Sequence, residues 1–147
     1  LTISSHNHVT KKSLLLLQNF MAMKNECFSF ENLNVWKESR KFVLSTYRLL
    51  DQFPPYEKFA LCDQLRRAVI SVPSNIAEGS GRLSLKEKIR FIEIAYASLM
   101  EVYCQLLLAL DLGYISSNDM ITVKRDVHLI AKMLNGLKFS FSKQGME

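Results

Sequence analysis

The sequence is poor in the residues that interrupt helices. Only five glycines and three prolines occur in 147 residues, and the prolines fall in two places, Pro54-Pro55 and Pro73. Proline breaks a helix interior because it lacks an N–H group, so long stretches remain available for helix. No alternating strand pattern competes. A length near that of one domain and a 48% apolar composition therefore predict a single all-α domain.

Cysteine and histidine are equally scarce. Cys27, Cys62 and Cys104 are an odd number without a Cys-x-x-Cys pair, which excludes the usual disulfide frameworks and zinc sites. We expect Cys62 and Cys104 to be small buried apolar residues in a reducing cytoplasm. His128 is the one histidine beyond residue 23, and the carboxylates are scattered. We therefore expect no catalytic residue, no metal and no cofactor, and so no enzyme.

No long apolar run marks the first 23 residues. Their run Leu14–Leu17 is too short for a signal-peptide core or a membrane span, so no membrane partner is expected. The chain begins with leucine, and methionines stand at positions 21 and 23. Residues 1–23 are either a non-native upstream extension or a disordered tail, and both interpretations stay open. The folded domain is expected over residues 24–142, with a short tail over 143–147.

Four segments carry helical apolar spacing. The third, Leu85 to Leu110, has apolar residues, Tyr96 and Tyr103 among them, at steps of three and four without a miss, between a Ser84/Glu87 capping box and Gly113. The fourth repeats this spacing from Met120 to Phe141, after several N-cap candidates at residues 116–119. The second segment, at about 56–78, has helical spacing at Leu61, Leu65, Ala68, Val72 and Ile76. With a first segment at about 33–52 they make four helices. Connections of about five residues or fewer then predict an up-down-up-down antiparallel four-helix bundle.

Pro73 lies inside the second segment and is expected to kink it. A structural polar motif surrounds it: Pro73, Ser74, Asn75, Glu78 and Gly79. Ser74 or Asn75 is expected to bond the backbone groups that the proline frees, and Glu78 to hold an arginine from a neighbouring helix. The adjacent Arg66 and Arg67 could instead contact an anionic partner, and this alternative stays open.

Two segments have more apolar residues than one face needs. The first has Trp36, Val43, Tyr47 and Leu50 on one side and a second stripe beside them, and the third is apolar almost all round between residues 99 and 112. An exposed apolar face favours self-association. The candidate interface residues are Val35, Phe42, Leu49, Met100, Leu107 and Leu108.

The formal net charge of +5 permits an anionic partner without requiring one. Four cations gather where the third segment begins: Arg82, Lys86, Lys88 and Arg90. Cations at a helix N-terminus oppose its dipole, and such unfavourable choices often mark functional sites. A solvated surface is the simpler explanation. The functional one is phosphate contact with RNA or DNA by these four residues together with Arg66 and Arg67.

Several short runs resemble one known family. They are residues 30–36 (FENLNVW), 64–68 (QLRRA), 72–79 (VPSNIAEG), Gly81-Arg82, Arg90-Phe91 and 112–115 (LGYI). In order and spacing over about residues 28–141, they resemble the four-helix-bundle proteins named after intervening sequences in the 23S ribosomal RNA gene. Accessory proteins of diversity-generating retroelements belong to the same group. Ala60-Leu61-Cys62 departs mildly from this pattern, where Gly-Leu is usual.

The resemblance implies a homopentameric barrel of four-helix protomers with a basic surface. Retroelement members of the group bind nucleic acid and a reverse transcriptase, which would be partners here if the protein is retroelement-associated, whereas for most other members no activity is established. A protein-interaction scaffold without a direct nucleic-acid role remains the alternative.

Overall fold

The structure, a computed structural model, describes residues 4–23 and 27–145, and over these residues the chain is helical without strands. The all-α prediction is confirmed. The α-helices are α1 (Ser4–Met23), α2 (Asn34–Leu50), α3 (Leu61–Ser80), α4 (Leu85–Asp111) and α5 (Ser117–Gln144). Short 3-10 helices precede α2 and α3: η1 (Ser29–Asn32) and η2 (Pro55–Glu57). Helix α5 runs two residues past the predicted domain end at 142.

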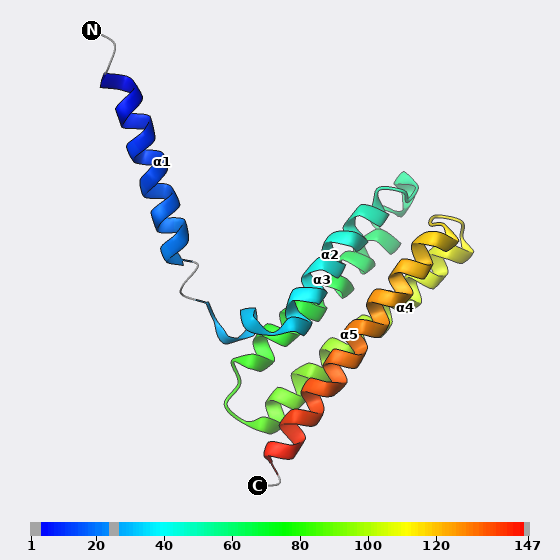
Figure 1. The fold of residues 1–147 in the computed structure, drawn as a ribbon. Helices are drawn as coiled ribbons and strands as arrows, with labels where there is room; N and C mark the ends of the chain where they lie inside the picture. Colours follow the sequence, from blue (N-terminus) through cyan, green and yellow to red (C-terminus); the bar gives the residue numbers. More distant parts are fainter. Residues whose placement is uncertain (1–3, 24–26, 146–147) are drawn as a thin grey trace.

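Helices α2 to α5 pack on one another, and successive helices run in opposite directions (Figure 1). Helix α3 packs against α2 and α4, and α5 packs against α4 and α2. Helix α1 projects away from them (Figure 1) and contacts no other described element. The sequence pattern did not predict this helix, and its described side chains, residues 13–22, are all exposed.

The buried faces of α3 and α5 follow the predicted stripes. In α3, Leu65, Ala68, Val72 and Ile76 are buried. In α5 the buried stripe is Met120, Val123, Val127, Ile130 and Leu134. Their spacing of three and four residues keeps them on one side of each helix.

The buried faces of α2 and α4 are rotated from the predicted ones. In α2 the core face contains the polar Ser39 and Thr46, both fully buried, between Val35, Phe42 and Leu50. In α4 it centres on Ala95, Leu99, Val102, Leu106 and Ala109, while the predicted Tyr96 and Tyr103 are only half-buried. The apolar residues that surround α4 between residues 99 and 112 therefore include core residues, among them Val102 and Ala109. Cys104 was predicted to be buried but is exposed.

The helix ends explain where the chain turns. Gly113 has φ +77°, and the N–H groups of Gly113 and Tyr114 donate to the carbonyls of Leu110 (2.9 Å) and Ala109 (2.8 Å). This pair of bonds closes α4 as a Schellman motif. Helix α5 then begins with a complete capping box of Ser116 and Asp119. The hydrogen bonds from the Ser116 side chain and backbone lower the pKa of the Asp119 carboxyl.

The box predicted at the start of α4 is only half formed. The Ser84 hydroxyl accepts from the Glu87 N–H (3.2 Å), but the Glu87 carboxylate lies 3.7 Å from the Arg90 guanidinium. The start of α4 therefore has one capping hydrogen bond, and the Glu87 carboxylate pairs with Arg90 instead of capping the helix.

Gly79 lies where α3 approaches α4 most closely. A Cβ added there would lie 2.8 Å from the Cβ of Phe91, an atom held next to the backbone. We expect Gly79→Ala to lower the free energy of unfolding by about 1–3 kcal/mol, the usual cost of overpacking. Gly136, inside α5, has no atom within 4 Å of such a Cβ. We expect Gly136→Ala to raise stability by about 0.5–1 kcal/mol. Thermal or urea unfolding measures both, and two changes of the same sign would contradict the close approach.

Candidate functional site

The positive charge of the folded part is concentrated at one end. Residues 27–42, 71–98 and 133–145 form the end that holds the α3–α4 connection (Figure 1). They carry nine Lys and Arg against five Asp and Glu, whereas residues 43–70 and 99–132 carry seven of each. We call the first set of residues the basic end. The whole positive excess of residues 27–145 therefore lies in one half of the folded chain.

Four cations surround the α3–α4 connection, and we call Arg82, Lys86, Lys88 and Arg90 the basic turn. The Arg82 guanidinium pairs with Glu78 and lies over the Phe91 ring, 4.6 Å from its centroid. The Lys88 ammonium lies 5.6 Å from the Phe141 centroid. These contacts to aromatic faces hold the side chains on the surface while leaving their charges near water.

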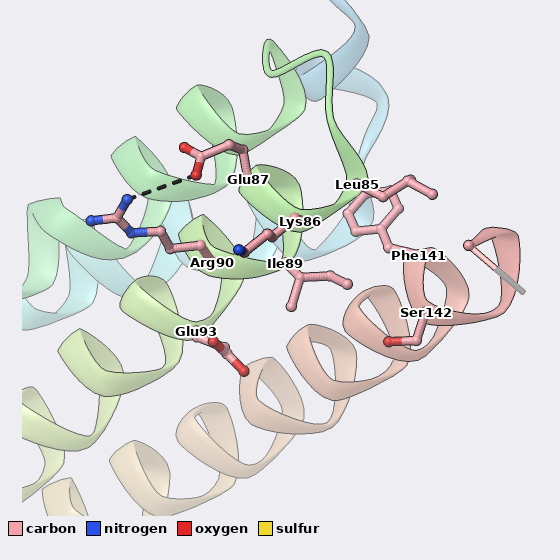
Figure 2. Close-up of a pocket in the computed structure, with 9 residues that line it drawn as sticks. Leu85, Lys86, Glu87, Ile89, Arg90, Glu93, Phe141 and Ser142 are labelled. Carbon is pink, nitrogen blue, oxygen red and sulfur yellow. Dashed lines mark ion pairs between the residues drawn. The ribbon is translucent and has the colours of Figure 1, made fainter.

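A groove between the start of α4 and the end of α5 adjoins the basic turn. Its volume is about 790 Å³. Figure 2 shows Leu85, Ile89 and Phe141 along it, with Lys86 and Arg90 on the α4 side. Glu93, another lining residue, pairs with Lys138 (2.6 Å). The groove thus has an apolar floor and a rim on which cations stand beside paired carboxylates.

The structure does not bring all six predicted contact residues together. Arg66 precedes Arg82 by 16 residues, which corresponds to about 24 Å along a helix. Arg67 pairs with Asp63 (2.6 Å), and Arg66 donates to the Lys58 carbonyl (3.4 Å). Arg66 and Arg67 therefore lie in the electrically balanced half, apart from the basic turn.

The Pro73 motif has a local structural role, with partners different from those predicted. Ser74 donates to the Ile70 carbonyl (2.8 Å). Asn75 donates to the Ser71 carbonyl (2.8 Å) and to the Ser71 hydroxyl (2.9 Å). Pro73 has no N–H group, so the Val69 carbonyl loses its usual helical donor. The Ser74 and Asn75 side chains do not bond this carbonyl but the two that follow it, those of Ile70 and Ser71. Glu78 holds Arg82 of the adjoining connection, and the prediction of an arginine from a neighbouring helix was wrong.

The candidate interface residues divide into two groups. Val35 and Phe42 are buried inside the protomer, and Leu49 and Met100 are half-buried. Only Leu107 (38% exposed) and Leu108 (49% exposed) present large apolar surfaces to solvent. A second copy could therefore reach the α4 residues but not Val35 or Phe42, because these two fill the core between α2 and its neighbours.

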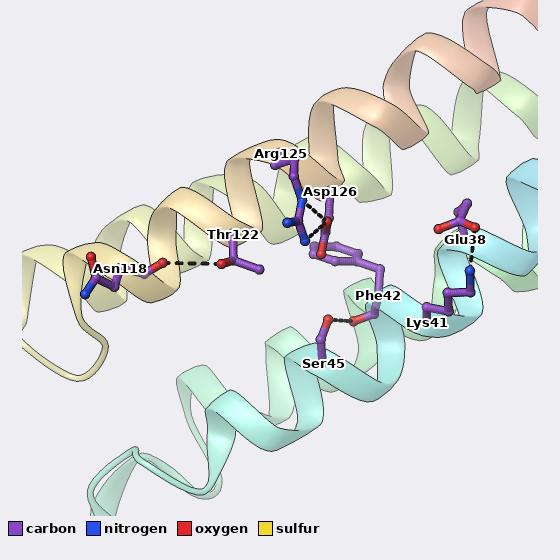
Figure 3. A network of polar contacts seen from close by, with 8 residues as sticks. All are labelled: Glu38, Lys41, Phe42, Ser45, Asn118, Thr122, Arg125 and Asp126. Carbon is purple, nitrogen blue, oxygen red and sulfur yellow. Dashed lines mark hydrogen bonds and ion pairs between the residues drawn. The ribbon is translucent and has the colours of Figure 1, made fainter.

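The cleft between α2 and α5 is a less suitable site for an anion. Its volume is about 260 Å³. Figure 3 shows its charges paired with one another: Lys41 with Glu38 (2.7 Å) on α2, and Arg125 with Asp126 (2.9 Å) on α5. Since each cation there has its own carboxylate, the cleft adds no net charge.

Several cations of the basic end were not predicted as contact residues. Lys37 and Arg40 stand on α2 and Lys138 and Lys143 on α5. They are far from residues 82–90 in sequence, and only the packing of the helices brings them to the same end. The sequence feature that could have indicated them is the excess of cations over carboxylates in residues 27–42 and 133–145.

Within residues 4–23 and 27–145, no three His, Cys, Asp or Glu side chains gather in a group that could hold a metal ion. Helix α4 is long and apolar enough to cross a membrane by length and composition. The core helix of a folded protein passes the same test, and α4 packs along α3 and α5.

A family model described as 23S rRNA-intervening sequence protein matches residues 31–136, well over half of the chain. The chain belongs to this family. The family resemblance predicted from the short runs is thereby confirmed. The 23S rRNA-intervening sequence match includes the whole basic turn and ends inside α5, before Lys138. No match is found among curated proteins.

Proposed function

We propose that the protein is a non-enzymatic, homo-oligomeric nucleic-acid-binding protein. Helices α2 to α5 form an up-down-up-down four-helix bundle, five copies of which assemble into a barrel. Each copy contacts phosphates of RNA or DNA through its basic end. The observation that carries this proposal is the concentration of the positive excess at one end, nine cations against five carboxylates.

The chemistry of the basic turn supports phosphate contact. Lys86 and Arg90 are exposed, and the Arg90–Glu87 pair at 3.7 Å is long and open to solvent. Exposed ion pairs contribute little free energy. A phosphate can therefore take the place of the carboxylate at low cost. Arginine also binds phosphate through two parallel N–H groups.

Exposed apolar surface on α4 supports the homo-oligomeric part of the proposal. Leu107 and Leu108 offer exposed apolar surface on α4, and contiguous apolar surface favours burial against another chain. Rotational symmetry repeats every surface patch once per copy. A ring would therefore multiply the basic turns along one nucleic-acid strand.

A protein-interaction scaffold is the second candidate. Leu44 on α2 and Ile121 and Leu129 on α5 are exposed large apolar residues (60%, 68% and 41%). A protein partner such as a reverse transcriptase could dock on them, with the charge serving only solubility. In either case we propose a cytoplasmic protein without a membrane partner.

Salt dependence tests the proposed function. If one copy makes four phosphate contacts with a single strand, the affinity should fall about 50-fold between about 50 and 200 mM salt. Fluorescence anisotropy of a labelled oligonucleotide measures this in the full chain. Binding that does not change with salt, or no binding at the lower salt concentration, would contradict the proposal. Capture of a protein partner after nuclease treatment would then favour the scaffold.

A further inference from the structure

A cluster of aromatic rings stands beside the basic end, and phosphate contact makes no use of it. The Phe28 ring lies parallel to the Phe30 ring, with centroids 6.1 Å apart and an angle of 5° between planes. The Phe30 ring meets the Trp36 ring edge-on at 4.9 Å. The Arg40 guanidinium lies 4.8 Å from the Trp36 ring centroid. The four side chains thus present flat surfaces one after another.

The outermost ring of this cluster is not part of the core. Phe28 is 73% exposed, although it is a large apolar side chain. Its backbone N–H donates to the Glu31 carboxylate (3.0 Å). Next to it, the Ser29 hydroxyl bonds the Ser80 hydroxyl at the end of α3 (3.0 Å). Phe28 is therefore held in place by its neighbours without being buried, and such preorganisation reduces the cost of binding.

Cations and amides lie beside Trp36, the innermost of these rings. A pocket of about 540 Å³ lies beside Trp36, and Asn32, Asn34, Lys37 and Arg40 line part of it. Neither Lys37 nor Arg40 forms an ion pair within the described part of the chain. Glu31 and Glu38 also line the pocket, but Glu31 already accepts the Phe28 N–H and Glu38 pairs with Lys41. The carboxylates are thus engaged, whereas the two cations are available.

The Ser29–Ser80 hydrogen bond connects this cluster to the basic turn. It ties η1 to the last residue of α3, and Arg82 follows two residues later. One extended ligand could therefore touch the exposed Phe28 ring and the cations at the same end of the molecule.

We propose that the partner is single-stranded nucleic acid, and that an unpaired base stacks on the Phe28 platform while Lys37 and Arg40 contact the flanking phosphates. This inference rests on the proposed function and narrows it. Only an unpaired base exposes its flat face, because a duplex already stacks its bases. Exposed aromatic rings beside a positively charged surface are the features with which proteins bind single strands.

Trp36 makes the test direct, because it is the single tryptophan of the chain. A single-stranded oligouridylate at low salt should quench its fluorescence, and a duplex of equal length should bind more weakly and quench less. Phe28→Ala should weaken single-strand binding about tenfold, within the range for losing one stacked base. Phe28→Tyr, which keeps the flat ring, should bind within about twofold of the wild type, since every ring with a π-face stacks.

Phe59 provides a matched control. It is 85% exposed, and the Lys58 ammonium lies 5.3 Å from its ring centroid, but it belongs to the balanced half. Phe59→Ala should leave the affinity unchanged. If Phe28→Ala binds the single strand as tightly as the wild type, or an abasic strand of equal length binds as tightly as the oligouridylate, the inference is overturned while the proposed function stands. Failure of the wild type to bind any nucleic acid at low salt would overturn both.

Discussion

Phe42→Ala is expected to lower the free energy of unfolding by about 3–5 kcal/mol, the usual loss for a large buried aromatic ring. The side chain is 2% exposed and is among the largest fully buried ones. Removing it leaves a cavity between α2 and the facing α5, where Ile130 also lies. Total stabilities are only about 5–15 kcal/mol, so most of the stability would be lost. Urea denaturation followed by circular dichroism measures the difference.

Two matched substitutions separate a core role for Phe42 from an interface role. Leu44→Ala removes an apolar side chain from the same helix, but Leu44 is 60% exposed, so its effect should stay within about 0.5 kcal/mol. The double change Leu107→Ser with Leu108→Ser should leave the helix content intact. It should reduce the mass of the proposed oligomer measured by sedimentation. If instead Phe42→Ala kept its stability and lost only the assembly, the core assigned to α2 would be wrong.

The sequence was sufficient for the helices whose apolar residues recur without polar interruption. In α5 every buried residue belongs to the predicted stripe, and in α3 the predicted stripe is joined by the fully buried Val69, which was not predicted. In α2 the fully buried Ser39 and Thr46 interrupt the pattern. Ser39 satisfies its hydroxyl locally by donating to the Trp36 carbonyl (2.9 Å), which allows a polar residue to face the core. Binary patterning counts such residues as surface, so the face was misassigned by one position.

The buried face of α4 was predicted wrongly for the opposite reason. Apolar residues surround it between residues 99 and 112, so periodicity alone could not distinguish the core face from its neighbours. Small residues mark the core face of α4. Ala95 and Ala109 are fully buried and allow the adjacent helices to approach closely. The larger Leu107 and Leu108 remain outside.

Only part of the site could be predicted, because some of its residues are close together in the sequence and others are brought together by the packing of the helices. Residues 82–90 are close in sequence, so their cluster was evident without a structure. The separation of Arg66 and Arg67 follows from helical rise alone and could have been foreseen. The placement of Phe28, Trp36, Lys138 and Lys143 at the same end could not, because it depends on how the helices pack.

The second large effect is expected from neutralising the basic turn. The quadruple variant Arg82→Gln, Lys86→Gln, Lys88→Gln and Arg90→Gln removes four charges and keeps side chains of moderate length. Its fold should survive, since the ion pairs that are lost are exposed and each is worth about 0–1 kcal/mol. Loss of several phosphate contacts should weaken binding about 100-fold at low salt.

Arg66→Gln with Arg67→Gln is the matched control from the balanced half. It removes two charges from exposed and half-buried positions on α3 and leaves the basic turn intact. Its affinity should stay within about threefold of the wild type if contacts at the basic end dominate. Circular dichroism and thermal unfolding confirm that both variants are folded before they are compared.

The most direct measurement is the dissociation constant of a labelled single-stranded RNA at about 50 mM salt for these two variants and the wild type. The proposed basic end predicts a large loss for the basic-turn variant and almost none for the Arg66/Arg67 variant. Equal binding by the wild type and a folded basic-turn variant would contradict the central claim that this end of the molecule holds nucleic acid.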